Sequence, residues 1–275
     1  MKRIIFLTAV FVLAAYLLHA QEKTLVELWK TDAVWKVPES VLPDPASKTL
    51  YVSNIDGEPW GKDGKGSIGK MGSDGKNLVV EWVKGLNAPK GMGLYKGKLY
   101  VADVDELVVI DVKAAKIEKH IPVAGAGTLN DVTVAANGDV YVSDSKNGEI
   151  FRYSKGEITK YLSDLQGING VLSTADGFYF VAKGALYKVN AGGHIKIADG
   201  MEPSTDGIEQ TRSGDFIVSS WSGAVYYIKK DGSKTELLNT IDKKINAADI
   251  GYDPANGTLY VPTFFHNSVY AYQVK

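Results

Sequence analysis

The chain has 275 residues, with 31 Lys and Arg against 32 Asp and Glu, which gives a formal net charge of −1. Basic residues are interspersed with acidic ones and form no stripe, so nothing in the charge pattern suggests a nucleic-acid partner. The sequence contains no Cys, which excludes disulfides and a thiol nucleophile.

The N-terminal segment has the features of an export signal. Lys2 and Arg3 precede an apolar run over residues 4–18, and we expect cleavage after Ala20. The alternative is an uncleaved membrane anchor, but this run is shorter than the roughly 20 residues that a spanning helix needs. No Cys follows the run, so a lipid anchor there is excluded by chemistry. The sequence predicts a signal peptide over 1–20, one domain over 21–275, and a secreted or periplasmic protein without membrane contact after cleavage.

Six short apolar runs, rich in Tyr and β-branched residues, recur along the remaining chain at a period of about 40 residues. They begin at Leu50, Leu99, Val140, Phe178, Phe216 and Leu259. Further alternating segments follow each run, and Asn-Gly, Asp-Gly or Ser-Gly turns separate several of them. Four strands in each of six repeats predict an all-β chain folded as a six-bladed β-propeller. An open β-sandwich is the competing interpretation, but its strands carry no fixed period.

The two ends of the chain are predicted to share the sixth blade. The last repeat, from Ala248 to Lys275, is long enough for only three strands. An isolated strand pattern over Thr24–Trp29 stands at the start of the mature chain. We expect this N-terminal strand to complete the sixth blade and to hide sheet edges that would otherwise be open.

The first repeat is longer than the others, and the excess lies at Asp56–Lys65. Strand counting places this segment between the second and third strands of blade one. In a propeller that connection lies on the same face as the start of the innermost strand. The segment is either a rim or lid over a binding site or an inert surface excursion.

Each repeat opens with a residue that a propeller directs toward its central channel. In chain order these residues are Glu39, Lys90, Asn130, Asn169, Asp206 and Ala248. Two carboxylates and two carboxamides thus converge on one axis, and all four supply hard oxygen donors. This donor set predicts a divalent metal ion, above all Ca²⁺, with Mn²⁺, Mg²⁺ or Zn²⁺ as alternatives. Taken singly, Asn169-Gly170 and Asp206-Gly207 are also ordinary turn dipeptides, and only their shared phase with Glu39 and Asn130 favours a site.

The short sequence segments around these positions resemble those of the senescence marker protein/gluconolactonase/luciferin-regenerating-enzyme family. The resemblance covers essentially the whole mature chain. The segments are Pro38-Glu39-Ser40, Leu129-Asn130-Asp131, Ile168-Asn169-Gly170 and Thr205-Asp206-Gly207. The resemblance implies that Glu39, Asn169 and Asp206 are metal ligands and that Asn130 is a ligand or a substrate contact. It further implies hydrolysis of lactones or phosphoesters, with Asp206 as base or nucleophile.

Two positions depart from that family. Thr128 stands where the sugar-lactonase branch has an Arg that helps to hold substrate, so an aldonolactone substrate does not follow from the resemblance. Lys90 faces the channel, where its ammonium group either pairs with Glu39 and Asp206 and excludes a metal or lies further out and stabilises an oxyanion. The metal site and a metal-free polar core therefore both stay open at this point.

Rim candidates come from the connections between second and third strands. They are Trp60, Asp103, Asp105, Asp144, Lys183, Trp221, Phe264, Phe265 and His266. Trp60, Trp221 and Phe264 are expected to form an apolar wall, and His266 is the one His at the rim. Asp103 and Asp144 are equally well explained as turn residues that bind backbone amides. Asp131 and Asp249, which follow opening positions, are expected to make structural hydrogen bonds.

Two functions remain. The first is a metal-dependent hydrolase of a lactone or related ester, in which Asp206 and Lys90 are catalytic and Asn130, Trp60, Trp221 and His266 contact a small-molecule substrate. The second is a non-catalytic propeller, similar to NHL-repeat modules, that binds a ligand or a protein on its rim. The four candidate metal ligands, Glu39, Asn130, Asn169 and Asp206, favour the hydrolase. Lys90 and Thr128 favour the non-catalytic propeller. The sequence says nothing about the oligomeric state.

Overall fold

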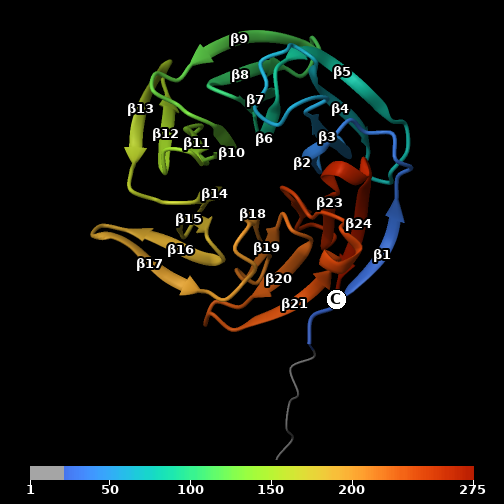
Figure 1. The fold of residues 1–275 in the computed structure, drawn as a ribbon, viewed down its shortest axis with the longest axis vertical. Coiled ribbons are helices and arrows are strands. Elements are labelled where there is room, and N and C mark those ends of the chain that lie inside the picture. Colours follow the sequence, from blue (N-terminus) through green and yellow to red (C-terminus); the bar gives the residue numbers. More distant parts are fainter. Residues whose placement is uncertain (1–21) are drawn as a thin grey trace, which may run out of the picture.

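Six four-stranded antiparallel sheets form a closed ring in the computed structural model of the protein (Figure 1). The structure describes residues 22–275, so the expected signal peptide over 1–20 lies outside the described residues. No helix in the described range is long and apolar enough to cross a membrane. The expectation of a six-bladed β-propeller is confirmed.

Five blades are continuous in sequence, and each runs from the channel outward. Blade one contains β2 (Pro38–Asp44), β3 (Thr49–Asn54), β4 (Gly66–Gly72) and β5 (Val79–Leu86). Blade two contains β6 (Pro89–Tyr95), β7 (Lys98–Asp103), β8 (Glu106–Asp111) and β9 (Lys116–Pro122). Blade three contains β10 (Leu129–Val134), β11 (Val140–Asp144), β12 (Glu149–Ser154) and β13 (Glu157–Leu162). Blade four contains β14 (Ile168–Thr174), β15 (Gly177–Ala182), β16 (Ala185–Asn190) and β17 (Gly193–Ala198). Blade five contains β18 (Thr205–Gln210), β19 (Phe216–Ser220), β20 (Ala224–Ile228) and β21 (Lys234–Asn239).

The sixth blade joins the two ends of the described chain. Its strands are β22 (Gly251–Asp253), β23 (Thr258–Pro262), β24 (Val269–Val274) and, at the outer edge, β1 (Leu25–Lys30). β1 is antiparallel to β24, with Leu25 opposite Val274 and Lys30 opposite Tyr270. The predicted closure by the N-terminal strand is confirmed, and it covers the edge that β24 would otherwise expose.

Apolar side chains fill the spaces between neighbouring blades. Between blades four and five, for example, Tyr179 packs on Phe216 with ring centroids 4.7 Å apart, and both side chains are buried. Full burial of such side chains contributes about 1.5–3 kcal/mol each. The alternation of apolar and polar residues in the repeats therefore fixes the spacing of the blades and, through it, the shape of the channel.

A β-bulge in the innermost strand turns five of the six opening residues toward the channel. The register between first and second strands shifts at Pro38/Ser40, Pro89/Met92, Leu129/Val132, Ile168/Val171 and Thr205/Ile208. A bulge adds a residue to one strand and redirects its side chains. The five shifts enclose Glu39, Lys90, Asn130, Asn169 and Asp206, so the same local device aims all five side chains.

Serine hydroxyls on the second strands stabilise three of these bulges. Ser53 Oγ accepts a hydrogen bond from the Ser40 amide at 2.9 Å, and Ser143 Oγ does the same for the Asp131 amide at 2.9 Å. In blade five Ser219 Oγ accepts from the Gly207 amide at 2.9 Å. A bulged amide has no partner in the ladder, so the hydroxyl satisfies a donor that would otherwise be buried unpaired.

The glycines after two opening residues are required by close packing at the channel. A Cβ on Gly170 would lie 2.1 Å from the Asp206 carbonyl oxygen, and a Cβ on Gly207 would lie 2.5 Å from Asp249 Oδ1. Both glycines belong to strands, so Asn169-Gly170 and Asp206-Gly207 are not turns. The interpretation of these pairs as simple turn dipeptides is wrong.

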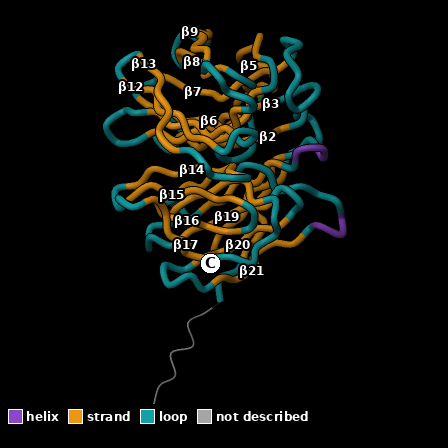
Figure 2. The backbone as a smooth tube through the Cα atoms, turned by 60° about the vertical axis from the view of Figure 1, so that its left-hand side comes forward, coloured by secondary structure: helices purple, strands orange, loops and turns teal. Residues whose placement is uncertain are grey.

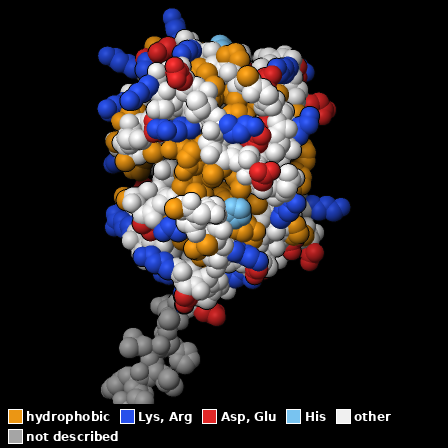
Figure 3. Space-filling view, turned by 90° about the vertical axis from the view of Figure 1, so that its left-hand side faces the viewer, with side chains coloured by type: hydrophobic (Ala, Val, Ile, Leu, Met, Phe, Trp, Pro, Cys, Tyr) orange, Lys and Arg blue, Asp and Glu red, His pale blue; other side chains and the backbone are white. Residues whose placement is uncertain are grey.

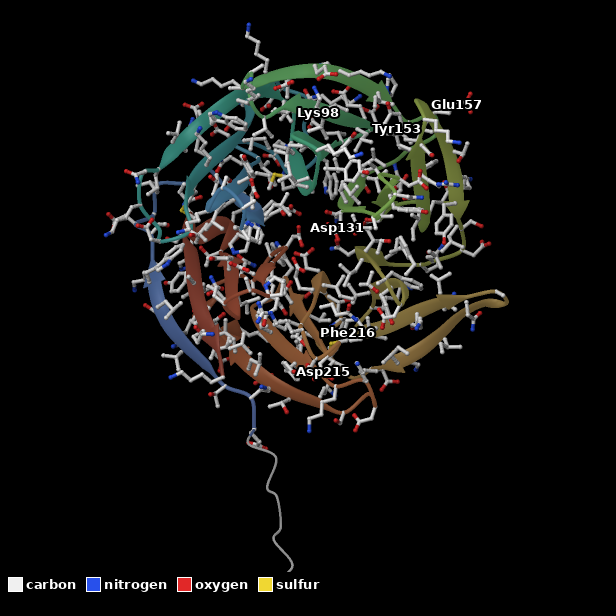
Figure 4. All side chains as sticks on the ribbon, turned by 180° about the vertical axis from the view of Figure 1, so that it is seen from behind. Lys98, Asp131, Tyr153, Glu157, Asp215 and Phe216 are labelled. Carbon is white, nitrogen blue, oxygen red and sulfur yellow. The ribbon has the colours of Figure 1, made fainter. Side chains whose placement is uncertain are left out.

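Two short 3-10 helices, η1 (Ile241–Lys243) and η2 (Phe264–His266), project from the same side of the disc (Figure 2). On the outer edge, charged side chains of both signs alternate with apolar ones (Figure 3). Seen from behind, Asp131 lies near the centre of the ring, whereas Lys98 and Glu157 lie further out (Figure 4).

Candidate functional site

A pocket of about 350 Å³ lies at the mouth of the channel where the inner strands begin. It is lined by Glu39, Pro59, Trp60, Lys90, Asn130, Asn169, Asp206, Trp221, Phe264 and Phe265. The five opening residues with polar side chains therefore meet in one place, although they are drawn from five different blades. The apolar lining comes from the β3–β4, β19–β20 and β23–β24 connections, as strand counting predicted.

Glu39 brings an unsatisfied carboxylate oxygen to the pocket. Its side chain is only 4 % exposed, and its Oε2 atom is buried without a hydrogen-bond partner. Burial raises the pKa of Glu39 well above its usual range; nearby Lys90 opposes this, and Asp206 adds to it. A buried acceptor without a donor costs free energy unless some cation or donor occupies the site.

Lys90 faces the same pocket, but it is held toward the rim. Its Nζ donates to the Pro59 carbonyl oxygen at 2.6 Å and lies 4.2 Å from the centroid of the Trp60 ring. Within the described residues it forms no ion pair within 4.0 Å with Glu39 or Asp206. Burial lowers the pKa of Lys90, while the charges of Glu39 and Asp206 oppose that shift. In this position Nζ forms a direct ion pair with neither carboxylate, although both charges act on it.

The carboxamide of Asn130 is oriented by a hydrogen bond of its amino group, and that of Asn169 lies beside Asp206. Asn130 Nδ2 donates to Ser145 Oγ at 3.1 Å. Burial raises the pKa of Asp206, and Asp249 adds to this rise, whereas a hydrogen bond from the Asn169 side chain and the charge of Lys90 oppose it. With the amino group of Asn130 engaged, its carboxamide oxygen is left to act as an acceptor or a ligand.

This donor set fits a hard divalent cation. Glu39 has a buried oxygen without a partner, and Asp206 and the two Asn side chains supply further oxygens in the same pocket. Ca²⁺ takes carboxylate and carboxamide oxygens as ligands and completes its coordination shell with water. Within residues 22–275 no group of three or more His, Cys, Asp or Glu is placed to hold a metal ion. A site here therefore depends on the two carboxamides as well as the two carboxylates.

Aromatic side chains form the wall above these polar groups. The Trp221 ring meets Phe264 at 5.5 Å and Phe265 at 6.1 Å between centroids, with interplanar angles of 79° and 81°. Phe264 and Phe265 meet each other at 4.7 Å. Edge-to-face contacts of this kind are favourable for aromatic pairs. Trp60 belongs to the long segment of blade one, so that segment forms part of the rim.

The remaining rim candidates lie elsewhere. His266 is exposed on η2 and does not line the pocket, so its expected substrate contact is not supported by its position. Lys183 is also exposed, and Asp105 forms an ion pair with Lys62 at 2.6 Å.

Asp103 and Asp144 are fully buried and have structural roles. Asp103 Oδ2 accepts a hydrogen bond from the Asn87 amide at 2.8 Å, and its Oδ1 accepts one from the Ala88 amide at 2.7 Å. Asp144 likewise accepts from the Gly127 amide at 2.7 Å. Each carboxylate thus fixes the segment that leads into the innermost strand of its own blade.

Asp131 and Asp249 make the structural hydrogen bonds expected of them. Asp131 accepts from the amide of Val132 at 2.7 Å and from that of Val171 at 2.7 Å, which links blades three and four. Asp249 Oδ2 accepts from Ser40 Oγ at 2.5 Å, which links blades six and one. These contacts hold the inner strands together around the channel.

A second cavity, of about 240 Å³, lies further along the channel and was not predicted. Glu209, Asp131 and Asp249 line it among mainly aliphatic side chains. Burial raises the pKa of Glu209 to about 8, with a further contribution from Asp249. Burial also raises the pKa of Asp249 to about 7, against the hydrogen bond from Ser40. The sequence signal for Glu209 was a charged residue three positions after an opening residue, where the other repeats have Leu42, Gly93, Thr133, Leu172 and Gly251.

Comparisons with solved structures support the fold. No protein-family model and no curated protein matches the sequence. A gluconolactonase from Xanthomonas campestris superposes with a TM-score of 0.69 and 18 % identity, covering 91 % of this chain and 89 % of that one. A luciferin-regenerating enzyme gives a TM-score of 0.65 at 13 % identity, covering 92 % and 97 %.

A catalytically inactive virginiamycin B lyase from Staphylococcus aureus, solved with quinupristin, gives a TM-score of 0.64 at 15 % identity, covering 92 % and 99 % of the two chains. The chain shares the fold of these three proteins. At such identities the likeness concerns the fold, and it supports at that level the resemblance that the sequence motifs indicated. Which reaction takes place in the pocket has to be argued from the residues that line it.

Proposed function

We propose that the protein is a metal-dependent hydrolase of a lactone or related ester, with a Ca²⁺-type ion at the mouth of the channel. The observation that carries the proposal is the convergence of Glu39, Asn130, Asn169 and Asp206 on one pocket in which a buried Glu39 oxygen has no hydrogen-bond partner. The enzymes among the structural neighbours make catalysis on this fold plausible and leave the reaction itself open.

Glu39, Asn169 and Asp206 would hold the ion, and Asn130 would either complete the set or orient the substrate. When bound, such an ion supplies Lewis-acid polarisation of the ester carbonyl. Asp206 lies in the same pocket, and burial raises its pKa well above its usual range, so its carboxylate would accept a proton from water more readily than an exposed carboxylate does. The carboxamide of Asn130 is fixed by Ser145 and offers its oxygen to the pocket.

Lys90 would stabilise the negative charge that develops on the carbonyl oxygen. One of its three N–H groups is committed to the Pro59 carbonyl, which leaves two donors on an ammonium that lines the pocket. A preorganised cationic donor in a site with little water stabilises an oxyanion much better than it would in water. Aromatic rings around the mouth limit the access of water to this group.

The second candidate is a non-catalytic propeller that binds a ligand on its rim. It is favoured by the exposed aromatic rings of Trp60, Trp221 and Phe265, which would suit a binding surface without any chemistry. It leaves the unpartnered oxygen of Glu39 unexplained, and for this reason we place the hydrolase first.

Turnover of simple lactones separates the two functions. Purified protein is incubated in a pH-stat with lactones, aryl esters and phosphoesters, with Ca²⁺, Mn²⁺ or Zn²⁺ supplied. The hydrolase predicts metal-dependent acid release from at least one lactone or ester, lost on addition of EDTA and reduced by about 10²-fold or more in Asp206→Asn. Asp215→Asn is the matched control, because Asp215 accepts from Tyr227 at 2.7 Å outside the pocket. Absence of turnover with every metal and substrate would leave the binding module standing.

A further inference from the structure

We propose that the substrates of this pocket are lactones or esters with an apolar aryl or alkyl body, rather than polyhydroxylated ones. The inference rests on the proposed function and adds to it a substrate class. In this arrangement the ester group reaches the polar floor of the pocket, and the apolar body lies among Trp60, Trp221 and Phe265.

The lining divides sharply by polarity. All charged and carboxamide side chains come from the bulged inner strands at the floor, and all five residues from the connecting loops are apolar. Those five are Pro59, Trp60, Trp221, Phe264 and Phe265. Binding sites for small molecules combine apolar walls with a few polar groups that fix orientation. Here the wall has no charged or carboxamide group that could bind several hydroxyls.

Two of the donor side chains at the floor already make a hydrogen bond to the protein. Asn130 donates to Ser145 Oγ at 3.1 Å, and Lys90 donates to the Pro59 carbonyl at 2.6 Å. A site that recognises hydroxyl groups needs donors and acceptors that are free to pair with them, since unpaired polar groups are costly once buried. The carboxylate and carboxamide oxygens and the other donors of Lys90 are the groups that the proposed function assigns to the metal and to one ester group.

Aromatic exposure is concentrated at this rim. Among the described residues, the exposed Trp and Phe side chains are Trp60 at 41 %, Trp221 at 36 % and Phe265 at 60 %, and all three line this pocket. Single exposed apolar residues are common on protein surfaces, but a cluster of large rings around one cavity marks a binding site for apolar groups.

Hydrogen bonds hold the backbone segment that carries the two rings of η2. Phe264 has φ of +47°, a left-handed conformation that is unusual for a bulky residue. The segment is closed by hydrogen bonds from the Thr263 amide to the Ser268 carbonyl at 2.9 Å and from Thr263 Oγ1 to the same carbonyl at 2.8 Å. Asn267 Oδ1 further accepts from the Val37 amide at 2.9 Å. Strain retained beside a pocket is expected where the position of a side chain matters for function.

A series of lactones with different bodies tests the proposal, with each kcat/KM divided by the rate constant for hydroxide-catalysed hydrolysis of the same lactone. We would measure kcat/KM with Ca²⁺ for δ-valerolactone, γ-nonalactone, dihydrocoumarin and glucono-δ-lactone. The alkyl- and aryl-bearing lactones are expected to exceed δ-valerolactone by about tenfold or more, and glucono-δ-lactone is expected to be the poorest of the four. A glucono-δ-lactone rate equal to or above that of dihydrocoumarin would overturn the proposal.

Variants at the rim assign the preference to the aromatic wall. Phe265→Ala and Trp221→Ala should lower kcat/KM for dihydrocoumarin about tenfold more than for δ-valerolactone, mainly through KM. Ile195→Ala is the matched control, because Ile195 is 49 % exposed on β17 and does not line the pocket. It should leave both values as they are in the unaltered protein. Equal losses for the two substrates in the aromatic variants would contradict the proposal.

A binding measurement distinguishes failure of this inference from failure of the proposed function. The lactam 3,4-dihydro-2-quinolinone resembles dihydrocoumarin but resists hydrolysis, and its binding can be followed by calorimetry. Binding that Phe265→Ala weakens, together with no turnover of any lactone, would support the apolar pocket and overturn the hydrolase. Turnover of lactones without any apolar preference would support the hydrolase and overturn the substrate class. Neither turnover nor lactam binding would overturn both.

Discussion

Lys90 is the residue whose position most affects the chemistry of the pocket. A cation beside two carboxylates either neutralises them or acts on substrate, and the two roles predict opposite effects of its removal. The hydrogen bond to Pro59 and the contact with Trp60 hold Nζ at the rim, without an ion pair to Glu39 or Asp206. This position leaves Nζ without a direct carboxylate partner, which the proposed role as a donor to the substrate oxygen requires.

Replacing Lys90 by Met should therefore affect turnover more than metal affinity. We expect turnover of an active lactone to fall by about 10²-fold, the scale seen on loss of an oxyanion donor, with Ca²⁺ affinity changed only severalfold. Lys62→Met is the control, since Lys62 ties the same loop to Asp105 at 2.6 Å but does not line the pocket. If Lys90→Met instead raised Ca²⁺ affinity strongly and left turnover intact, Lys90 would be a neutralising partner.

Glu209 makes a second prediction at the scale of single residues, because burial raises its pKa from 4.5 to about 8. Between these values the native state holds more protons than the unfolded state, so the Glu209 contribution to stability is full below pH 4.5 and falls as pH rises through about 8. Glu209→Gln cannot ionise, and its oxygen can still accept from the Tyr252 amide. In EDTA, the variant should exceed the unaltered protein in free energy of unfolding by about 1–3 kcal/mol at pH 8, with a smaller difference at pH 5.

Chemical denaturation at the two pH values measures this difference. Glu236→Gln is the matched control, because Glu236 is exposed on the outer strand β21, and it should show no comparable change between pH 5 and pH 8. A Glu209→Gln difference that is the same at both pH values would show that Glu209 does not titrate in this range.

At the scale of elements, the strands explain how distant residues reach one pocket. Each bulge places its opening residue at the channel, and the second-to-third-strand connections surround the same mouth. β1 contributes nothing to the pocket but covers the edge of β24 and closes the ring. Its role is therefore in stability and solubility.

Deleting Thr24–Trp29 should leave the sixth blade with an open edge. We expect the melting temperature to fall by about 4 °C or more, the shift that 1–2 kcal/mol produces in a domain of this size, and we expect concentration-dependent aggregation. Thermal melts and light scattering, with a chain that begins at Glu22 and keeps β1 as control, provide the measurement. A truncated protein that stays monomeric with an unchanged melt would contradict the closure.

At the scale of the whole molecule, the repeat period and the short last repeat were sufficient to predict six blades and their closure. The equivalent position of the opening residues within each repeat also predicted which side chains meet at the channel, because equivalent residues of a ring lie around one axis. Sequence could not place Lys90 Nζ, since its position depends on a carbonyl of the blade-one loop rather than on its own strand. It likewise missed the cavity at Glu209, because the width of the channel depends on the packing of all six inner strands.

His266 shows the limit of counting along the chain. Its connection was placed on the correct face, but the left-handed conformation of Phe264 turns the phenyl rings into the pocket and leaves the imidazole exposed. A conformation of this kind is unusual for a bulky residue and gives no signal in the repeat pattern. The repeat pattern thus placed Trp60, Trp221 and Phe264 at the pocket, but it could not predict which side chain of the β23–β24 connection turns away from it.

Calcium titration of the purified, EDTA-stripped protein tests the central claim most directly, since the proposed chemistry depends on the ion that Glu39, Asn169 and Asp206 would hold. We predict one Ca²⁺ per chain by calorimetry, with affinity reduced about tenfold or more in Glu39→Gln and in Asp206→Asn, and unchanged in Asp215→Asn. Absence of binding to the unaltered protein, or binding that neither pocket substitution weakens, would contradict the account.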